Sequence, residues 1–203
     1  MQLTRLVDTA ADLRLESPRL VLRKLGEADI ATAIAHEQDR RIMRWIRDPQ
    51  PVEEIGARSR SLAGPWQGFD GQWLALAVVP RPAGVPDGQQ QMIGIVVCRV
   101  TVAANQTMEI GYRLQVDAHR RGLGTEACTL LFDHLIGEIG VRKLVAYCVA
   151  ENEASWRLLE KLGMQREALL REYTFLDGQW RDEFVYGLLA REWRTPAAGA
   201  PIH

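Results

Sequence analysis

Cysteine is scarce in this sequence, and its spacing excludes common thiol and metal chemistry. The chain has three cysteines among 203 residues, and no two of them form a CxxC pair. Each lies in an apolar stretch, so we expect Cys98, Cys128 and Cys148 to be buried free thiols in a reducing compartment. The four histidines do not combine with these cysteines at metal-ligand spacing. The sequence therefore predicts no disulfide framework and no metal site.

A long apolar run and an excess of one charge are also lacking. No stretch approaches the ~20 apolar residues that span a bilayer, and residues 1–17 have no signal-peptide core. Lys and Arg number 25 against 26 Asp and Glu, which gives a net charge of −1. This balance provides no electrostatic basis for binding nucleic acid or an anionic membrane. We therefore expect a cytoplasmic protein with no nucleic-acid or membrane partner.

The sequence does contain enough apolar residues for one full core. Its apolar share is 47% and its charged share is 25%, both ordinary for a globular domain. A chain of 203 residues suits a single domain. The predicted organisation is an N-terminal lead-in over residues 1–16, one domain over residues 17–193, and a flexible Pro/Ala/Gly tail over residues 194–203.

Apolar periodicity predicts seven strands and four helices. The strands are expected at residues 20–23, 73–79, 92–102, 108–114, 141–149, 168–175 and 183–188. The helices are expected at residues 26–37, 51–63, 122–135 and 153–162. Gly163 ends the last helix as a cap residue, and Asp177-Gly178 predicts a hairpin turn between the last two strands. This order predicts a mixed α/β (α+β) fold, with helices on the faces of one sheet.

One loop leads from the fourth expected strand into a helix, and it suits an anion. It reads His119-Arg120-Arg121-Gly122-Leu123-Gly124-Thr125. The first turn of a helix has amides without intrahelical partners, and glycine lets the backbone approach a phosphate closely. The two arginines add positive charge, so a pyrophosphate is a natural ligand. Taken alone, the glycine pair also fits a plain strand-to-helix turn. The P-loop lysine and the third glycine of the dinucleotide fingerprint are both missing.

A second segment follows the fifth expected strand and begins with Asn152. Asn152 is well placed to cap the helix at residues 153–162. Its side chain could instead meet a ligand that lies beside this helix. The sequence alone leaves both interpretations open.

Together these segments resemble the GCN5-related N-acetyltransferase (GNAT) superfamily. The family loop Gln/Arg-x-x-Gly-x-Gly/Ala corresponds to His119-x-x-Gly122-x-Gly124. The segments at residues 16–23, 125–127, 152–163 and 177–193 are similar to the ribosomal-protein-alanine acetyltransferase branch. The resemblance spans about residues 15–193. It implies a sheet of about seven strands that is splayed between the fourth and fifth.

The resemblance also implies an activity. Enzymes of the family move an acetyl group directly from acetyl-CoA to a primary amine, with no metal. Here the amine would belong to a protein N-terminus or to a small molecule. Family members are often dimers. The acceptor, the acyl length and the oligomeric state stay open.

Cofactor contacts are carried over from the family by position. The resemblance implies that the backbone of Leu114 contacts the pantetheine arm, and that Asn152 and Ser155 lie along the pantetheine and the thioester. The pyrophosphate would be held by Arg120, Arg121, Gly122, Leu123, Gly124 and Thr125. His119 departs from the family's Gln or Arg. A histidine still donates hydrogen bonds, so we expect retained but weakened binding, or else an exposed loop residue.

Two residues are candidates for proton transfer. Strand alternation places Glu109 on one face with Gly111 and Arg113, and Glu109 is the candidate general base. The alternative is a strand carboxylate paired with Arg113. The family's usual tyrosine acid is replaced by Leu159, so Ser155 is the candidate partner of the leaving thiolate. Ser155 could instead only satisfy a backbone group. The missing tyrosine also keeps open a non-catalytic acyl-CoA sensor.

Four aromatic residues lie in or near the segments expected to determine acceptor specificity. They are Trp45, Trp66, Phe69 and Trp73. They could line a pocket for an apolar or sugar-like acceptor. They could equally belong to the core.

Overall fold

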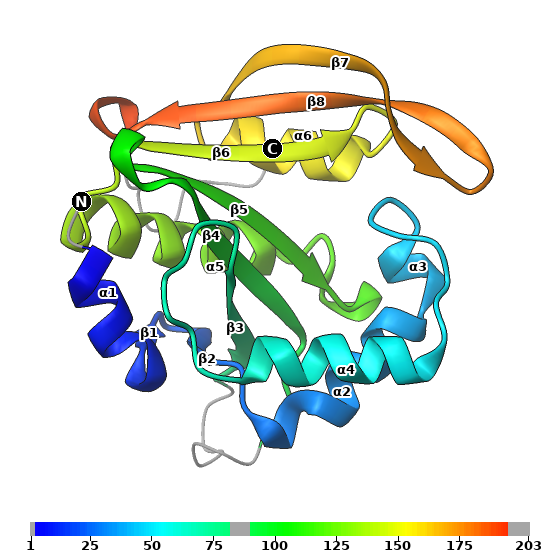
Figure 1. Ribbon diagram of the computed structural model, residues 1–203, viewed down its shortest axis with the longest axis horizontal. Coiled ribbons are helices and arrows are strands. Elements are labelled where there is room, and N and C mark those ends of the chain that lie inside the picture. Colours follow the sequence, from blue (N-terminus) through cyan, green and yellow to red (C-terminus); the bar gives the residue numbers. More distant parts are fainter. Residues whose placement is uncertain (1–2, 82–89, 195–203) are drawn as a thin grey trace.

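A computed structural model describes residues 3–81 and 90–194, which form one eight-stranded sheet flanked by helices (Figure 1). The strands are β1 (Arg14–Glu16), β2 (Leu20–Lys24), β3 (Trp73–Pro80), β4 (Gly94–Val102), β5 (Thr107–Leu114), β6 (Lys143–Val149), β7 (Gln165–Leu176) and β8 (Gln179–Leu189). The helices are α1 (Leu3–Thr9), α2 (Ile30–Gln38), α3 (Arg40–Met43), α4 (Val52–Ala63), α5 (Leu123–Phe132) and α6 (Glu153–Lys161).

The sheet is mixed, and its one parallel pair is incomplete. The strand order is β1-β2-β3-β4-β5-β6-β8-β7, and every neighbouring pair except β5 and β6 is antiparallel. β5 and β6 pair only where residues 107–109 meet residues 143–145. Beyond residue 109 the two strands continue without pairing, and they diverge in Figure 1. The expected splay between the fourth and fifth predicted strands is therefore confirmed at β5 and β6.

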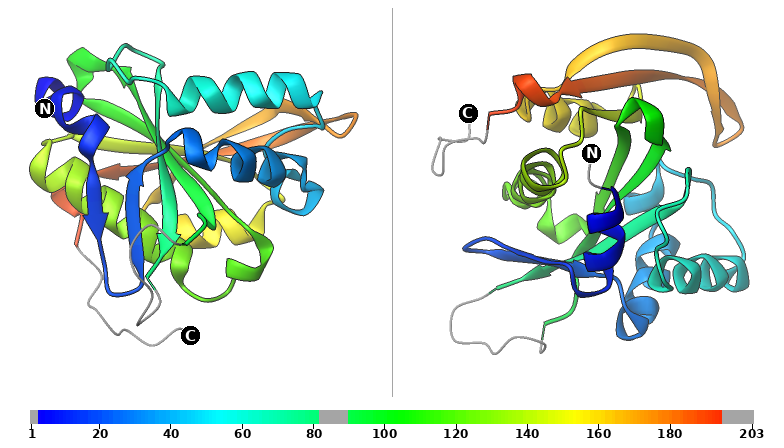
Figure 2. Two further views of the ribbon diagram at one scale, coloured as in Figure 1. Left: turned by 90° about the horizontal axis from the view of Figure 1, so that it is seen from below. Right: turned by 60° about the vertical axis from the view of Figure 1, so that its left-hand side comes forward.

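Helices cover both faces of the sheet, as two views in Figure 2 show. One face packs against α1, α5 and α6 in the larger apolar cluster, which includes Leu74, Leu76 and Leu131. The opposite face packs a smaller cluster under α2 and α4, which includes Ala75 and Ala77. β3 is buried on both sides because alternate side chains point into the two clusters. This explains its continuous apolar sequence.

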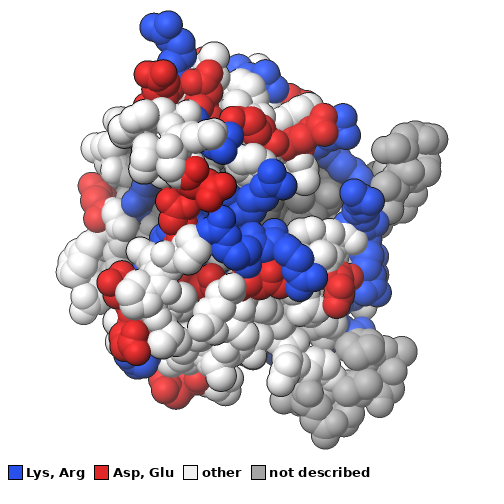
Figure 3. Space-filling model, turned by 90° about the vertical axis from the view of Figure 1, so that its right-hand side faces the viewer, with Lys and Arg blue, Asp and Glu red and all other residues white. Residues whose placement is uncertain are grey.

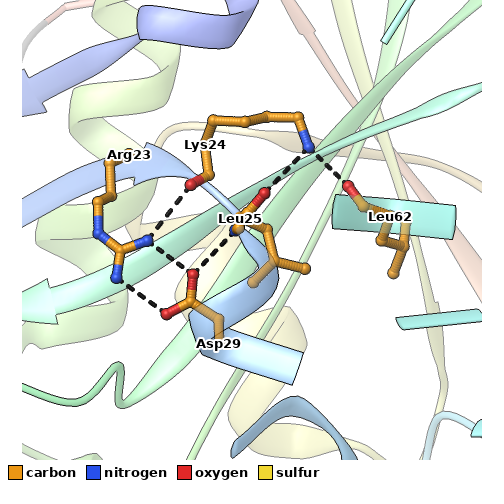
Figure 4. Close-up of polar contacts among 6 residues, drawn as sticks. Arg23, Lys24, Leu25, Asp29 and Leu62 are labelled. Atoms are coloured by element: carbon orange, nitrogen blue, oxygen red, sulfur yellow. Dashed lines mark hydrogen bonds and ion pairs between the residues drawn. The ribbon is translucent and has the colours of Figure 1, made fainter. Parts of the chain in front are cut away.

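An ion pair and a hydrogen bond from the end of β2 hold the two helices of the second face (Figure 4). Arg23 donates two hydrogen bonds to Asp29, at 2.7 and 2.9 Å. Burial alone would raise the pKa of Asp29, but the bonds from Arg23 and Gly26 outweigh it, and the pKa is lowered. Lys24 donates to the carbonyl oxygen of Leu62 at 2.6 Å, which satisfies an acceptor in the last turn of α4.

The predicted elements are found, with additions at short segments. All seven expected strands and four expected helices are present. The predicted number of strands, seven, is one too low, because the three-residue β1 also pairs with β2. The lead-in also supplies α1, whose Leu6 is fully buried. The expected helix at 122–135 changes into a π-helix at Asp133–Glu138. The domain boundaries stay predictions, and the expected tail lies outside the described residues except for Arg194.

The two predicted turns have the backbone geometry that their sequences require. Gly163 follows α6 with φ 82°, the left-handed conformation of a helix cap. Asp177 and Gly178 have φ 54° and 73° between β7 and β8. Positive φ at both central residues is the geometry of a tight hairpin turn that matches strand twist. Both predictions are confirmed.

The cysteines are buried and free. Burial raises the pKa of Cys98 and of Cys128 to about 12, so neither thiol is poised to ionise near neutral pH. Within residues 3–81 and 90–194, no helix is long and apolar enough to cross a bilayer.

Candidate active site

The gap between β5 and β6 exposes backbone groups of β5. Gln115 donates its backbone N–H to Ile93 at 2.8 Å, on the β4 side. In an antiparallel ladder, successive residues direct their amides to opposite sides. Leu114 and Tyr112 therefore direct their backbone groups away from β4 and toward the gap. An extended arm lying in this gap could pair with them as an added strand would.

The loop from β5 to α5 has the shape of an anion cradle. Arg120 and Gly122 both adopt positive φ, 57° and 73°. Gly122 is the N-cap of α5, which has ten residues. Backbone amides that converge in a left-handed turn, next to the positive end of a helix dipole, bind anions. The side chains of Arg120 and Arg121 are exposed beside this turn.

Gly124 brings the first turn of α5 against its neighbours. A Cβ atom at this position would lie 2.9 Å from Leu158 of α6 and 3.4 Å from Leu114 of β5. A larger residue here would push the side chain of Leu158 aside, so the second glycine of the loop permits this close packing. It lets the start of α5 sit directly at the end of the gap.

His119 occupies a place in the gap itself. Its Nε2 lies 2.9 Å from the carbonyl oxygen of Leu114. The predicted backbone contact of Leu114 is thus shared with a side chain of the same loop. His119 is exposed, which agrees with the expectation of a surface loop residue, and its part in cofactor binding stays a prediction.

Glu126, in the first turn of α5, is held by the turn between β1 and β2. Ser17 donates a hydrogen bond to one carboxylate oxygen at 2.6 Å, and Nε of Arg19 donates to the other at 2.7 Å. Arg19 also donates to the carbonyl oxygen of Arg121 at 3.0 Å. These bonds offset the negative charge of Glu126 beside the cradle and brace the loop from a distant part of the sequence.

Glu109 lies on the face of β5 opposite the side chains of Tyr112 and Leu114, and it pairs with Arg99. Nε and Nη2 of Arg99 donate to Oε2 of Glu109 at 2.8 and 2.6 Å. The carboxylate is only 13% exposed. The guanidinium of Arg99 stacks 4.5 Å above the ring of Trp73. The sequence alternative paired Glu109 with Arg113, and that partner is wrong: Arg113 bonds to Glu37 of α2.

A second carboxylate, Glu183, shares this face and was missed from the sequence. Glu183 is opposite Val149 and Tyr147 is opposite Val185 in the β6–β8 ladder, which places Tyr147 and Glu183 on one face of the sheet. Burial raises the pKa of Glu183, and the charge of Glu109 adds to this rise, while a hydrogen bond from Thr174 opposes it. The two carboxylates are therefore close enough to interact.

On the α6 side of the gap, Ser155 is engaged by a tyrosine. The hydroxyl of Tyr112 donates to the carbonyl oxygen of Ser155 at 3.0 Å, and its oxygen lies 3.0 Å from Oγ of Ser155. Burial raises the pKa of Tyr112. Asn152 caps α6, since its Oδ1 accepts a long bond of 3.4 Å from the Ser155 amide. Leu159, the position of the missing family tyrosine, is buried.

The four aromatic residues do not gather into one pocket. Trp66 is buried in the core and donates to the carbonyl oxygen of Gln72. Trp73 lies under Arg99, and Trp45 is contacted by the guanidinium groups of Arg44 and Arg181. Phe69 is 65% exposed. The core interpretation is correct for Trp66 alone.

No group of His, Cys, Asp or Glu side chains could hold a metal ion within the part of the chain that the structure describes. The arrangement at the gap suits transfer of a group between two bound organic molecules. An anion cradle and free strand amides lie at one side, and two carboxylates lie at the other.

Comparison with known families identifies the class of protein to which this site belongs. Residues 19–165 match the family described as the acetyltransferase (GNAT) domain. This match covers well over half of the chain, and the fold and gap agree with it. The chain belongs to the GNAT acetyltransferase family, and it is an N-acetyltransferase.

A curated relative agrees with this assignment, and two solved structures agree with the fold. The chain is 27% identical over 190 residues to the [ribosomal protein uS5]-alanine N-acetyltransferase of Escherichia coli, covering 91% of this chain and 94% of that protein. A GNAT-family acetyltransferase structure from Bacillus anthracis has a TM-score of 0.74 at 22% identity, covering 89% and 100%. A spermidine N-acetyltransferase from Vibrio cholerae, in complex with CoA and spermine, has a TM-score of 0.72 at 17% identity, covering 87% and 98%.

Proposed function

We propose that this N-acetyltransferase binds acetyl-CoA in the gap between β5 and β6 and acetylates the α-amino group of a protein or peptide N-terminus. The observation that carries the cofactor assignment is the divergence of β5 and β6 beyond residue 109, with the start of α5 packed beside the end of β5 at Leu114. The acceptor assignment rests on the full-length similarity to an enzyme that acetylates a ribosomal-protein alanine.

The loop residues would hold the pyrophosphate. The amides at Gly122, Leu123, Gly124 and Thr125 would face it, with Arg120 and Arg121 adding positive charge. The backbone of Leu114 would contact the pantetheine arm, sharing its carbonyl with His119. Asn152 would act through the helix cap, because its Oδ1 is turned to the Ser155 amide.

Bound acetyl-CoA supplies the acetyl group as a thioester. Glu109 would accept the proton that the attacking amine loses, directly or through water. Both bonds from Arg99 fall on Oε2, which leaves Oε1 to meet the amine. Ser155 would donate a hydrogen bond to the leaving sulfur after turning its hydroxyl from Tyr112. These groups lie on the two sides of the gap, which suits direct transfer between two substrates.

The experiment that tests this function measures both binding and turnover. Acetyl-CoA binding is measured by calorimetry, and turnover is measured with a panel of N-terminal peptides, polyamines and aminoglycosides. Arg121→Glu is expected to raise the dissociation constant for acetyl-CoA by about tenfold to a hundredfold, because it removes and reverses a charged hydrogen-bond donor. The control is Arg171→Glu, the same charge change at an exposed position of β7.

The cofactor assignment and the acceptor assignment can be refuted independently of each other. Equal affinity of the wild type and Arg121→Glu for acetyl-CoA would refute the phosphate loop. Turnover of polyamines or aminoglycosides in preference to every peptide would refute the peptide acceptor while leaving the cofactor site intact.

A further inference from the structure

The face of the sheet that holds Glu109 also holds a buried arginine cluster. Glu37, near the end of α2, has a side chain that is only 1% exposed. Its Oε2 accepts hydrogen bonds from Arg58 at 2.6 and 3.2 Å and from Arg47 at 3.3 Å. Its Oε1 accepts from Arg113 at 2.9 Å. Three guanidinium groups thus surround one carboxylate, which leaves two positive charges unmatched in the cluster.

A small cavity opens next to this cluster. Its volume is about 230 Å³, and its lining includes Glu37, Arg40, Met43, Arg47, Gln50 and Ile55. Pockets that enclose a whole small-molecule ligand are usually larger, at roughly 300–1,000 Å³. This cavity therefore has the size for one side chain or a similar group.

Two buried polar atoms at this place have no hydrogen-bond partner among the described residues. They are Oε1 of Gln50, which lines the cavity, and Nε of Arg113. Buried polar groups are normally paired, because an unpaired group loses its hydration without compensation. The amide of Gln50 can turn its NH₂ group into the cavity as readily as its oxygen. The cavity thus offers both positive charge and a free amide.

One member of the cluster, Arg113, lies on the same strand as the candidate base. Arg113 and Glu109 lie on one face of β5, four residues apart. At about 3.3 Å per residue, this separation is about 13 Å. An extended peptide whose N-terminal amine lies at Glu109 and which runs toward Arg113 would bring a side chain within its first four residues to the level of Arg113, which bonds to Glu37 at the cavity wall.

Positive charge is also gathered on one side of the molecule. Figure 3 shows the side of the molecule on which α3 and the tip of the β7–β8 hairpin lie in Figure 1, with Lys and Arg side chains gathered at its centre and acidic side chains above and below. Arg40, at the edge of the cavity, pairs with Asp177 of the hairpin turn at 3.2 Å, and both side chains are more than half exposed.

We infer that the cavity lined by Arg40, Arg47 and Gln50 is an acceptor subsite for a carboxylate, the acidic side chain near the N-terminus of the acetylated peptide. This inference rests on the proposed function and specifies its substrate class. A carboxylate would bond to Arg47 and Gln50 and match the surplus charge of the cluster. A polyamine or another polycationic acceptor would be repelled there.

The experiment uses octapeptides that are identical except at positions two to four, where one residue is Asp, Asn or Lys. We expect the wild type to have a kcat/KM about tenfold higher for the Asp peptide than for the Asn peptide, the effect of one charged hydrogen bond. The Lys peptide should be poorest. Arg47→Gln should bring the kcat/KM values for the Asp and Asn peptides within about twofold of each other.

Arg40→Gln gives a second variant that keeps all three partners of Glu37, and Arg60→Gln on the exposed side of α4 is the control. Equal use of Asp, Asn and Lys peptides by the wild type would overturn the inference. Equal losses in Arg47→Gln and Arg60→Gln would also overturn it.

If no peptide is turned over, the proposed acceptor fails, and the subsite is then tested by binding alone. The same peptides are titrated by calorimetry into the protein saturated with CoA. Selective binding of the Asp peptide that is lost in Arg47→Gln supports a carboxylate subsite. Equal binding of all three peptides, or no binding, overturns it.

Discussion

Arg99 donates two hydrogen bonds to a single oxygen of Glu109, across the register pair of β4 and β5. The pair fixes the carboxylate on the face of the sheet that also holds Glu183 and Tyr147. Arg99 is itself supported by the ring of Trp73. The candidate base is therefore held rigidly, with one oxygen directed by Arg99 and the other left for the acceptor amine.

Glu109→Gln should lower kcat by about a hundredfold, since general base catalysis contributes about 10²–10⁴. The amide oxygen can still accept from Arg99, so the dissociation constant for acetyl-CoA should stay within about twofold. Steady-state kinetics and calorimetry measure the two quantities. Glu54→Gln, at an exposed carboxylate in the first turn of α4, is the control. An unchanged kcat would make Glu109 a structural residue.

Glu183→Gln should change the pH dependence of stability. Burial raises the pKa of Glu183, so the folded protein binds this proton more tightly than the unfolded chain does. The stabilisation by this group is complete below the unfolded value of 4.5 and is lost as pH rises through the folded value. Relative to wild type, the variant should therefore gain melting temperature as pH rises above 4.5, by about 1–4 °C. Thermal denaturation at several pH values checks this, with Glu54→Gln alongside. A constant difference across pH would contradict the prediction.

Local signals in the sequence predicted the elements well. Gly163 and Asp177-Gly178 need positive φ, and both occur at the expected turns. The glycine loop begins α5 as expected. In contrast, β1 has only three residues and a polar sequence, so no periodicity marks it. It becomes a strand because β2 pairs with it.

Side-chain partners could not be predicted, because they depend on strand register. The 3₁₀ turn at Ala103–Asn105 and a bulge between Val100 and Val102 decide that Arg99 lies opposite Glu109. Glu183 reaches the same face only through the ladder between β6 and β8. No turn joins these two strands directly, so the sequence holds no local signal for their register. The pairing between Arg19 and Glu126, which are 107 residues apart, likewise has no local signal in the sequence.

Ser155→Ala should lower kcat by about tenfold if its hydroxyl stabilises the leaving sulfur. Tyr112→Phe should lower the free energy of unfolding by about 1 kcal/mol, because a buried hydrogen bond is lost. The double variant should lose less kcat than the two single effects combined, since both residues share one bond. Steady-state kinetics and urea denaturation of the wild type, the two single variants and the double variant measure this coupling. Independent effects on kcat would show that Tyr112 does not position Ser155.

Arg19→Ala should weaken acetyl-CoA binding through Glu126. The carboxylate of Glu126 lies in the first turn of α5 and is neutralised by Arg19. Without this partner, its charge would repel the pyrophosphate, and we expect a rise in the dissociation constant of about tenfold at low salt. The double variant Arg19→Ala/Glu126→Gln should recover most of the affinity. Calorimetry in low and high salt measures the effect. A double variant as weak as Arg19→Ala would mean that Arg19 contacts the cofactor or only braces the loop.

Glu37→Gln should be the most destabilising of these substitutions. Burial alone would raise the pKa of Glu37, but the bond from Arg58 and the charges of Arg113, Arg58 and Arg47 outweigh it, and the pKa is lowered. The neutral amide would leave three buried or half-buried guanidinium groups unmatched, which is expected to cost about 3–5 kcal/mol. The stabilisation by Glu37 is complete above the unfolded value of 4.5 and is lost as pH falls through the folded value.

Urea denaturation at neutral and acid pH measures this contribution, with Glu54→Gln as the control. The wild type should lose stability toward acid pH more steeply than Glu37→Gln, because only the wild type has this carboxylate to protonate. Equal stability of the wild type and Glu37→Gln at neutral pH would show that water hydrates the guanidinium groups in the variant and replaces the carboxylate as their partner. In that case the cluster would be open enough to hold a ligand carboxylate without Glu37.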